Sequence, residues 1–416
     1  MRFPAAVTLL FALTAPAFAD APPPGGPGEI VIPGSPDDLL PGRPRTIQSV
    51  MPQGVTEMSY EAIVPIIARH AFLAGDFAFF DAKADGYRAA ASRTTMGEWE
   101  LDLLYRSINV SEPQGVAHDS AGFAMLEAKT QGWAAKFPDA PTPHVMYAWL
   151  LIQQAWMLES YANEDDDVQQ GARYGVQAHA LLKQAEDYLL AHKAVASADP
   201  EWYAMMIEAV GGEYGQQARR DALLAEGAGR FPDYTPIYGH YLSRLLHDPK
   251  SNFAAVDAAI RDAARRTAAH SGDQMYARLY TVVRLCHCDG DDLFGTTRAD
   301  WPRMRQSFEQ IAAAFPDPWV MDEEFFFACE AGDKASAASA LKRIGANMAA
   351  PSPVWDYGQR ALCQSWLADS AAPQGVSPLK PQKPQDAAQS VPAYAQALVA
   401  VADLLGAAVA AILRFF

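Results

Sequence analysis

Residues 300–345, DWPRMRQSFEQIAAAFPDPWVMDEEFFFACEAGDKASAASALKRIG, decide how the chain is expected to fold. The apolar residues Met304, Phe308 and Ile311 recur at helical spacing, the pattern of one buried helical face. Pro316 then ends this helix, because a proline ring cannot continue it. A Phe-Pro-Asp turn and an Ala-Gly-Asp turn divide the stretch into three helices. The stretch therefore predicts short antiparallel helices, each of which buries one face against its neighbours.

The two turn sequences recur along the chain. Ala-Gly-Asp is found at residues 74–76 and 331–333, and Phe-Pro-Asp at residues 137–139, 231–233 and 315–317. Glycine can adopt the left-handed conformation at the end of one helix, and aspartate can cap the start of the next. Between successive Phe-Pro-Asp turns, the periodicity predicts two helical hairpins of about 42 to 47 residues each, within the range of degenerate helical repeats. We therefore expect an all-α, right-handed solenoid of tetratricopeptide-like helical hairpins over residues 59–369.

Residues 93–110 fit either kind of element. Trp99, Leu101 and Leu103 alternate as in a short strand, whereas Leu104 also fits a helix. A strand pair isolated among helices would be marginally stable. We therefore expect a helix in this part of the chain.

The ends of the chain differ in composition from the rest. Residues 1–19 contain Arg2, an apolar run and a small-residue cleavage site, which together indicate a secretory signal peptide, with an N-terminal anchor as the alternative. Residues 20–58 are rich in proline and glycine, and residues 370–392 are rich in proline and glutamine, so both are expected to be linkers. We therefore expect an exported protein that resides in the periplasm.

Residues 393–416 predict an amphipathic C-terminal helix. Apolar residues such as Leu398, Leu405 and Ile412 fall on one stripe of this helix. A membrane span would place Asp403 near the centre of the bilayer, at a cost of about 2.5 to 3.5 kcal/mol. We expect this helix to dock on a protein surface or to lie at a membrane surface, with a true span as the alternative.

The chain of 416 residues is 50% hydrophobic and has a formal net charge of -16. Its hydrophobic content is sufficient for a large core. An acidic surface repels the phosphate backbone of nucleic acids, whose binding requires clusters of lysine and arginine, so we expect no nucleic acid partner. The same negative field would attract a basic protein or peptide, although it also serves solubility.

A crowded set of potential metal ligands lies between residues 286 and 292. The set comprises Cys286, His287, Cys288, Asp289, Asp291 and Asp292. A structural zinc site takes four ligands, commonly as two spaced pairs, and this run supplies one Cys-x-Cys without a second pair. The aspartates lack the spacing and the distal glutamate of the standard calcium loop. As an alternative hypothesis, His287, Asp289, Asp291 and Asp292 bind a metal.

Motifs of catalysis are absent from the sequence. It contains no Gly-x-Ser-x-Gly elbow, no phosphate-binding loop and no dinucleotide fingerprint. We therefore predict no catalytic residue and no cofactor.

Four cysteines in an exported chain favour disulfides. Cys286 and Cys288 lie at the end of one predicted helix, Cys329 lies near the end of an equivalent helix, and Cys363 lies in a later one. Equivalent helices of stacked hairpins lie side by side. We therefore predict a disulfide from Cys286 or Cys288 to Cys329, and buried free thiols are the alternative.

Several motifs together resemble a known family. They are Asp-Pro-Glu-Trp-Tyr at residues 199–203, Gly-Glu-Trp-Glu-Leu at 97–101, Asp-Trp-Pro-Arg-Met at 300–304 and Ala-Cys-Glu-Ala-Gly-Asp-Lys at 328–334. In combination, over residues 59–366, they resemble the bacterial domain of unknown function 4034. The resemblance implies a tetratricopeptide-like helical array, and it supplies no catalytic residue.

These observations predict an exported helical-repeat scaffold that binds another protein or a peptide. Helical solenoids expose long concave faces that fit extended partners, and the acidic balance favours a basic partner. The alternative is an enzyme, metal-dependent or otherwise, whose active site is assembled from residues far apart in the sequence.

Overall fold

The fold is all-α, as predicted. The computed structural model describes residues 68–69, 71–108, 120–164, 168–210, 216–247, 252–287, 292–345, 352–356 and 358–380. Within these residues the only extended pairing is an isolated antiparallel bridge between Arg93 and Trp99. The remaining regular structure is helical.

The helices are mostly short, and two of them are much longer than the rest. In chain order they are α3 (Phe77–Ala90), α4 (Glu100–Arg106), α5 (Ser120–Lys136), α6 (Pro141–Glu164), α7 (Val168–Ala191), α8 (Lys193–Ala196), α9 (Glu201–Val210), α10 (Gln217–Arg230), α11 (Thr235–Leu246), α12 (Phe253–Ser271), α13 (Gln274–His287), α14 (Leu293–Thr296), α15 (Trp301–Ala314), α16 (Pro318–Glu330), α17 (Lys334–Ile344) and α18 (Gln359–Ala368).

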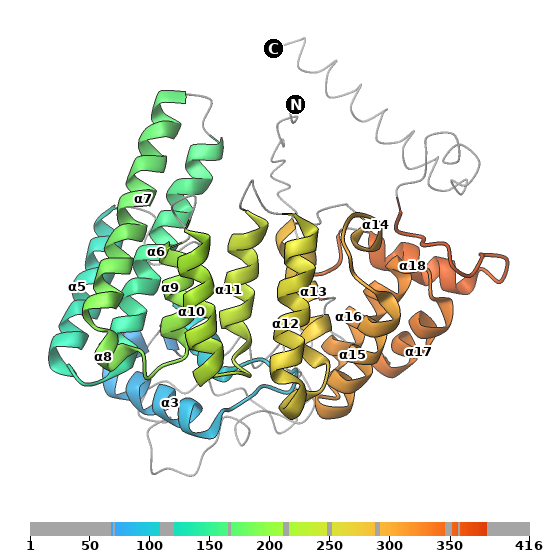
Figure 1. The fold of residues 1–416 in the computed structure, drawn as a ribbon, viewed down its shortest axis with the longest axis horizontal. Helices are drawn as coiled ribbons and strands as arrows, with labels where there is room; N and C mark the ends of the chain where they lie inside the picture. Colours follow the sequence, from blue (N-terminus) through green and yellow to red (C-terminus); the bar gives the residue numbers. More distant parts are fainter. Residues whose placement is uncertain are drawn as a thin grey trace, which may run out of the picture.

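Most successive helices pack against each other along the chain (Figure 1). The helices α9, α11 and α13 also contact one another in sequence, and α10 and α12 each pack on the two of them that flank it. This alternation is the local arrangement that stacked hairpins require, because each helix buries one face on the helix before it and another on the helix after it.

Two hydrophobic clusters form the core. The larger cluster extends from the first described helical residues to Val354 and includes the fully buried Trp133, Trp202 and Phe308. The smaller cluster lies among α16, α17 and α18 and includes Phe325. The residues with helical spacing in α15, Met304, Phe308 and Ile311, are all buried, so the predicted helical face is confirmed.

The repeated turns have the predicted conformations. Gly75 and Gly332 adopt positive φ angles of 78° and 71°, and the aspartates that follow them cap the next helices. Asp76 accepts a hydrogen bond from the backbone of Phe79, and Asp333 accepts one from Ser336. The turns therefore form through the local chemistry that the sequence shows, a glycine stop followed by an aspartate cap.

The paired helices α6 and α7 differ from the prediction. The predicted hairpins are longer than a regular tetratricopeptide unit, and the excess predicts a loop at residues 161–171. Instead, α6 continues to Glu164 and α7 begins at Val168. The helices continue because their ends pack closely: the rings of Tyr161 and Tyr174 are 5.9 Å apart, and Gly171 allows the backbone of Ala162 to approach. As a result, this hairpin extends beyond its neighbours (Figure 1).

Several predictions fall on residues that the structure does not describe. These are the signal peptide at residues 1–19, the linker at 20–58 and the amphipathic helix at 393–416. Of the second linker, residues 370–380 are described, and Gly375 donates a backbone hydrogen bond to Gly332 in the turn between α16 and α17. Among the described residues, no helix combines the length and the apolar character needed to cross a membrane.

The segment before α4 connects distant parts of the chain. The prediction of a helix over residues 93–110 is confirmed in part: α4 covers Glu100–Arg106, whereas residues 93–99 form turns and an isolated bridge. Ahead of α4, the side chains of Arg93 and Trp99 donate to the backbone carbonyl of Asp233, and the hydroxyl of Thr95 donates to Asp317. The segment therefore touches two of the three Phe-Pro-Asp turns, 231–233 and 315–317.

Gly97 lies at the tightest point of this segment. Its φ is +81°, and a Cβ atom there would lie 2.3 Å from Nη2 of Arg278 and 2.6 Å from the ring of Phe315. We expect Gly97→Ala to lower the free energy of unfolding by about 2 to 3 kcal/mol, because it adds overpacking to a left-handed backbone. Gly358 has the same φ of +81° with no atom within 4 Å of its Cβ position, so Gly358→Ala is the matched control. Equal losses of stability in urea unfolding would contradict this account.

Candidate functional site

Charged side chains from three separate parts of the chain meet beside α9. The group, here called the central polar cluster, comprises Glu98, Asp102, Arg106, Glu201, Glu208, His240 and Arg244. Glu98 lies just before α4, and the other members lie on α4, α9 and α11. All ten residues of α9 are buried, including Glu201 and Glu208, because α6, α7, α10 and α11 all pack against this helix.

Glu208 organises one end of the cluster. Its carboxylate is 2% exposed and lies 2.7 Å from Nδ1 of His240 and 2.5 Å from Nε of Arg244. Burial alone would raise the pKa of Glu208, but Arg244 and His240 lower it to about 2. Burial opposes the protonation of His240, yet the carboxylate of Glu208 raises the pKa of that imidazole. This end of the cluster is therefore a charged, hydrogen-bonded triad.

The other end of the cluster has an excess of carboxyl groups. Burial, and then the neighbouring charge of Asp102, raise the pKa of Glu201 to about 8. The hydroxyl of Tyr234 donates to Glu201 over 2.7 Å. Arg106 lies 3.0 Å from both Glu98 and Asp102 and partly neutralises them. Burial still raises the pKa of Asp102 despite the opposing charge of Arg106. The positive charge beside Asp102 therefore does not fully offset the cost of burying its carboxylate.

The cluster is anchored in the core and also reaches solvent. Its buried members are Glu201 and Glu208, each 2% exposed. The side chains of Arg106 and Glu98 are 46% and 39% exposed, and that of His240 is 21% exposed. Charged groups that are held in place by buried partners and remain accessible are the arrangement that a binding site for a charged ligand requires.

The raised pKa of Glu201 predicts a pH dependence of stability. A carboxyl group that titrates near 4.5 in the unfolded chain and near 8 in the folded chain stabilises the fold below pH 4.5, and this contribution is lost as the pH rises to 8. Between pH 5 and pH 8 the free energy of unfolding of the wild type should fall because Glu201 ionises. We expect the fall to be smaller by at least about 1 kcal/mol in Glu201→Gln. Urea unfolding at both pH values measures the difference. An unchanged pH dependence in the variant would refute the assignment to Glu201.

The predicted metal ligands are only partly described. Asp292 lies at the start of α14 and forms an ion pair of 2.7 Å with Lys380. His287 is the last residue of α13, and Cys288, Asp289 and Asp291 lie outside the described residues. In the part of the chain that the structure describes, no three histidine, cysteine or acidic side chains are grouped so as to hold a metal ion.

The predicted disulfide from Cys286 or Cys288 to Cys329 is wrong. Cys329 pairs instead with Cys363, with Cα atoms 6.1 Å apart, and Cys286 is a free, exposed thiol. The reason is the order of packing: α16, which contains Cys329, contacts α18, which contains Cys363. Both paired cysteines are buried in the smaller hydrophobic cluster. The general expectation of a disulfide holds, with Cys363 of α18 as the partner of Cys329.

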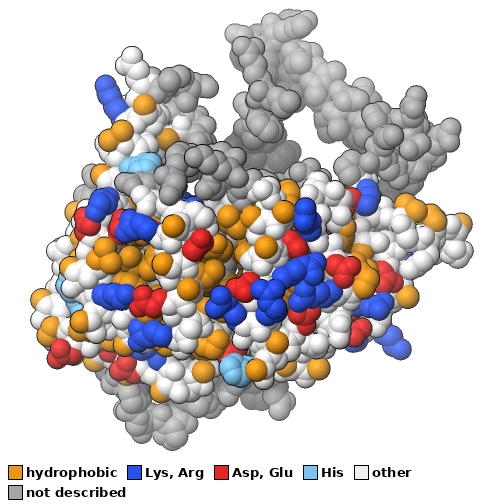
Figure 2. All heavy atoms as spheres, in the orientation of Figure 1, with side chains coloured by type: hydrophobic (Ala, Val, Ile, Leu, Met, Phe, Trp, Pro, Cys, Tyr) orange, Lys and Arg blue, Asp and Glu red, His pale blue; other side chains and the backbone are white. Residues whose placement is uncertain are grey.

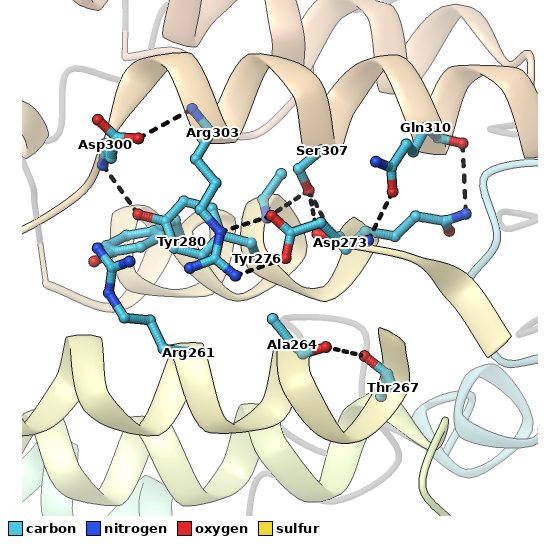
Figure 3. A network of polar contacts seen from close by, with 12 residues as sticks. Arg261, Ala264, Thr267, Asp273, Tyr276, Tyr280, Asp300, Arg303, Ser307 and Gln310 are labelled. Atoms are coloured by element: carbon cyan, nitrogen blue, oxygen red, sulfur yellow. Dashed lines mark hydrogen bonds and ion pairs between the residues drawn. The ribbon is translucent and has the colours of Figure 1, made fainter. Parts of the chain in front are cut away.

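A second polar network joins α12, α13 and α15 (Figure 3). Arg303 contacts both carboxylate oxygens of Asp273 at 2.6 Å, and its guanidinium lies 4.1 Å from the ring centre of Tyr276. Ser307 accepts a hydrogen bond from the backbone of Ala277, and Gln310 accepts one from the backbone of Asp273. These groups satisfy one another at a helix junction, so the network holds the helices together and leaves little charge for a ligand.

Exposed arginines of α12 and α15 also have acidic neighbours. Arg265 and Arg266 both pair with Asp262, and Arg305 lies near Glu309 and Asp333. Figure 2 shows positive and negative side chains interspersed on this face of the molecule. The central polar cluster differs, because its carboxyl groups are less completely compensated.

Sequence reasoning did not find the central polar cluster. One signal was present: Glu201 and Glu208 interrupt the otherwise apolar helix EWYAMMIEAV with a spacing of two helical turns. His240 and Arg244 likewise lie one turn apart on α11. Polar positions that repeat on one face of a buried helix indicate partners on other elements, but they do not identify those partners.

Comparison of the chain with the models of known protein families, with curated proteins and with solved structures finds no match. The class of protein that can be stated from the fold is an all-helical protein with a partly exposed central polar cluster. The resemblance to the bacterial domain of unknown function 4034 stays a prediction based on the sequence motifs.

Proposed function

We propose that this protein is an exported helical-repeat scaffold, a right-handed solenoid of tetratricopeptide-like hairpins, that binds a segment of another protein or a peptide at the central polar cluster. The observation that supports the proposal is the combination of buried and exposed charge beside α9. Glu208 is 2% exposed and holds His240, whereas Arg106 is 46% exposed. A partner can therefore reach charged groups whose positions are fixed by the core.

The charge of the cluster favours a basic partner. Four carboxyl groups, Glu98, Asp102, Glu201 and Glu208, face two arginines and one histidine, and Glu201, with its pKa of about 8, is mostly protonated at pH 7. A positive charge from a partner would favour its ionised form. Asp102 raises the pKa of the Glu201 carboxyl group, and Glu201 raises the pKa of the His240 imidazole. A lysine or arginine side chain of the partner would offset the repulsion between these carboxyl groups. The net negative charge of the chain would also attract such a partner.

The proposal is tested by co-purification from the periplasm with quantitative mass spectrometry. Glu98→Gln/Asp102→Asn removes two acidic groups from the carboxyl-rich end of the cluster, where the side chains of Glu98 and Asp102 are 39% and 15% exposed. Asp187→Asn/Glu309→Gln removes two from outside it, where both side chains are 62% exposed. We expect the cluster variant to capture at least about tenfold less of a basic partner and the control variant to match the wild type. Equal capture by both variants, with unchanged helicity, would exclude this site.

A further inference from the structure

Arg93 and Arg278 form a second charged group next to the central polar cluster. Arg93 donates to the backbone carbonyl of Asp233 over 3.1 Å, and its guanidinium lies 3.3 Å from the ring centre of Trp99. Arg278 donates to the backbone carbonyl of Met96 over 2.9 Å and lies over the ring of Phe315. Within the described residues, neither guanidinium forms an ion pair with a carboxylate.

Many other arginines at helix contacts differ from these two. Those that form an ion pair with an aspartate or glutamate include Arg88, Arg106, Arg244, Arg303, Arg343 and Arg360. Burial, followed by the neighbouring charge of Arg278, lowers the pKa of Arg93 to about 9. Both guanidinium groups also contact residues 96–97, Arg93 through the carbonyl of Gly97 at 3.5 Å and Arg278 through that of Met96. The two positive charges therefore lie close enough to repel each other, and each is only partly exposed. An anion between them would relieve that repulsion.

We propose that Arg93 and Arg278 bind a carboxylate group of a ligand, and that in the partner segment this group is the C-terminal carboxylate. The identification of the source rests on the proposed function, whereas the site itself does not. Backbone carbonyls and aromatic rings hold both guanidinium groups in position. An arginine carries five N–H donors in a planar fork that matches a carboxylate, and the contacts described above occupy only a few of them.

The surrounding charges favour a carboxylate over a phosphate. The charge of Asp233 acts on Arg93, and the charge of Glu98 acts on Arg278. Glu323 is held in its neutral form at pH 7, because burial, with Glu98, raises its pKa to about 8 against the opposing charge of Arg278. A neutral carboxyl group can donate a hydrogen bond to a carboxylate. The negative charges of Glu98 and Asp233 would repel the dianion of phosphate more than a single negative charge.

Glu98 connects this site with the central polar cluster. Its carboxylate lies 3.0 Å from Arg106, and its charge also acts on Arg278. A peptide whose terminal carboxylate contacts Arg93 and Arg278 would therefore have its neighbouring residues close to Glu98 and Asp102. The ligand class that fits both sites is a basic segment with a free C-terminus.

The test uses the full-length protein and two synthetic probes, N-acetyl-trilysine with a free C-terminus and the same peptide with a C-terminal amide. Isothermal titration calorimetry at constant ionic strength gives the ratio of their affinities. We expect the free acid to bind at least about tenfold more tightly than the amide, since one charge-assisted bidentate contact is lost in the amide. A ratio near one in the wild type would overturn the proposal.

Variants and simple anions complete the test. Arg278→Met is expected to bring the ratio near one, whereas Arg261→Met, at a surface arginine paired with Asp257, should leave it unchanged. Arg278→Lys keeps the positive charge if the methionine variant does not fold, and it should lower the ratio at least about threefold because the bidentate fork is lost. A ratio that persists in either Arg278 variant would exclude this site, and tighter binding of inorganic phosphate than of acetate would refute the carboxylate assignment. These probes need no natural partner, so their binding can be interpreted even if the proposed function is wrong.

Discussion

Replacing Arg88 with methionine is expected to lower the free energy of unfolding by about 3 to 5 kcal/mol, because the change leaves a buried carboxylate without its charged partner. That carboxylate belongs to Asp199, whose side chain has no exposed surface. Arg88 pairs with it, the hydroxyl of Tyr105 donates to it over 2.6 Å, and the backbone of Glu201 donates over 2.8 Å. Without Arg88, two neutral donors remain to stabilise a full negative charge.

The position of Asp199 explains why the effect should be large. It lies immediately before α9 and links that helix to α3, through Arg88, and to α4, through Tyr105. Loss of the pair would therefore affect the helix that carries Glu201 and Glu208. We expect the central polar cluster to lose order together with global stability.

Urea unfolding followed by circular dichroism measures the loss. Lys183→Met is the control, because Lys183 and its partner Asp187 are 54% and 62% exposed, and such a surface pair contributes less than about 1 kcal/mol. Asp199→Asn in the Arg88→Met background should recover part of the stability, since it removes the uncompensated charge. A cost below about 1 kcal/mol for Arg88→Met would show that water or another group already compensates Asp199.

The helices and their turns could be predicted because they depend on neighbouring residues. Gly332 followed by Asp333 ends α16 and caps α17 through contacts within a few positions, and the spacing of Met304 and Phe308 marks the buried face of α15. Such local signals are sufficient for element type and approximate bounds. Of the alternating residues Trp99, Leu101 and Leu103, Trp99 alone lies in an extended pairing, the isolated bridge with Arg93, whereas Leu101 and Leu103 lie in α4.

The central polar cluster could not be predicted because it depends on contacts between distant residues. Asp102 and Glu201 are far apart in sequence, and their interaction exists only once α4 lies beside α9. The same limit applies to the partner of Cys329: the repeat pattern suggested an equivalent helix, but the contact of α16 with α18 placed Cys363 there. Sequence periodicity identifies which face of a helix is buried, and it does not identify what the face is buried against.

Reduction of the Cys329–Cys363 disulfide is expected to lower the free energy of unfolding by about 3 to 4 kcal/mol. The two cysteines are 34 positions apart, and a cross-link over a loop of this length restricts the unfolded chain substantially. The bond also ties α18 to α16, so the last helix should fray first in the reduced protein. Hydrogen exchange should then show faster exchange in α18 than in α9, which is buried along its whole length.

Comparing oxidised and reduced protein of the same sequence avoids the cavity that a cysteine-to-alanine change would leave. The Cys286→Ser variant is the control, because Cys286 is free and exposed, and it should show the same difference between its oxidised and reduced forms as the wild type. Alkylation without reductant, followed by peptide mapping, should modify Cys286 and leave Cys329 and Cys363 protected. Modification of Cys329 under these conditions would mean that the pair is not formed, and the stability of the last three helices would then come from the remaining packing around Phe325 and Trp366 and from ion pairs such as Arg343–Glu324.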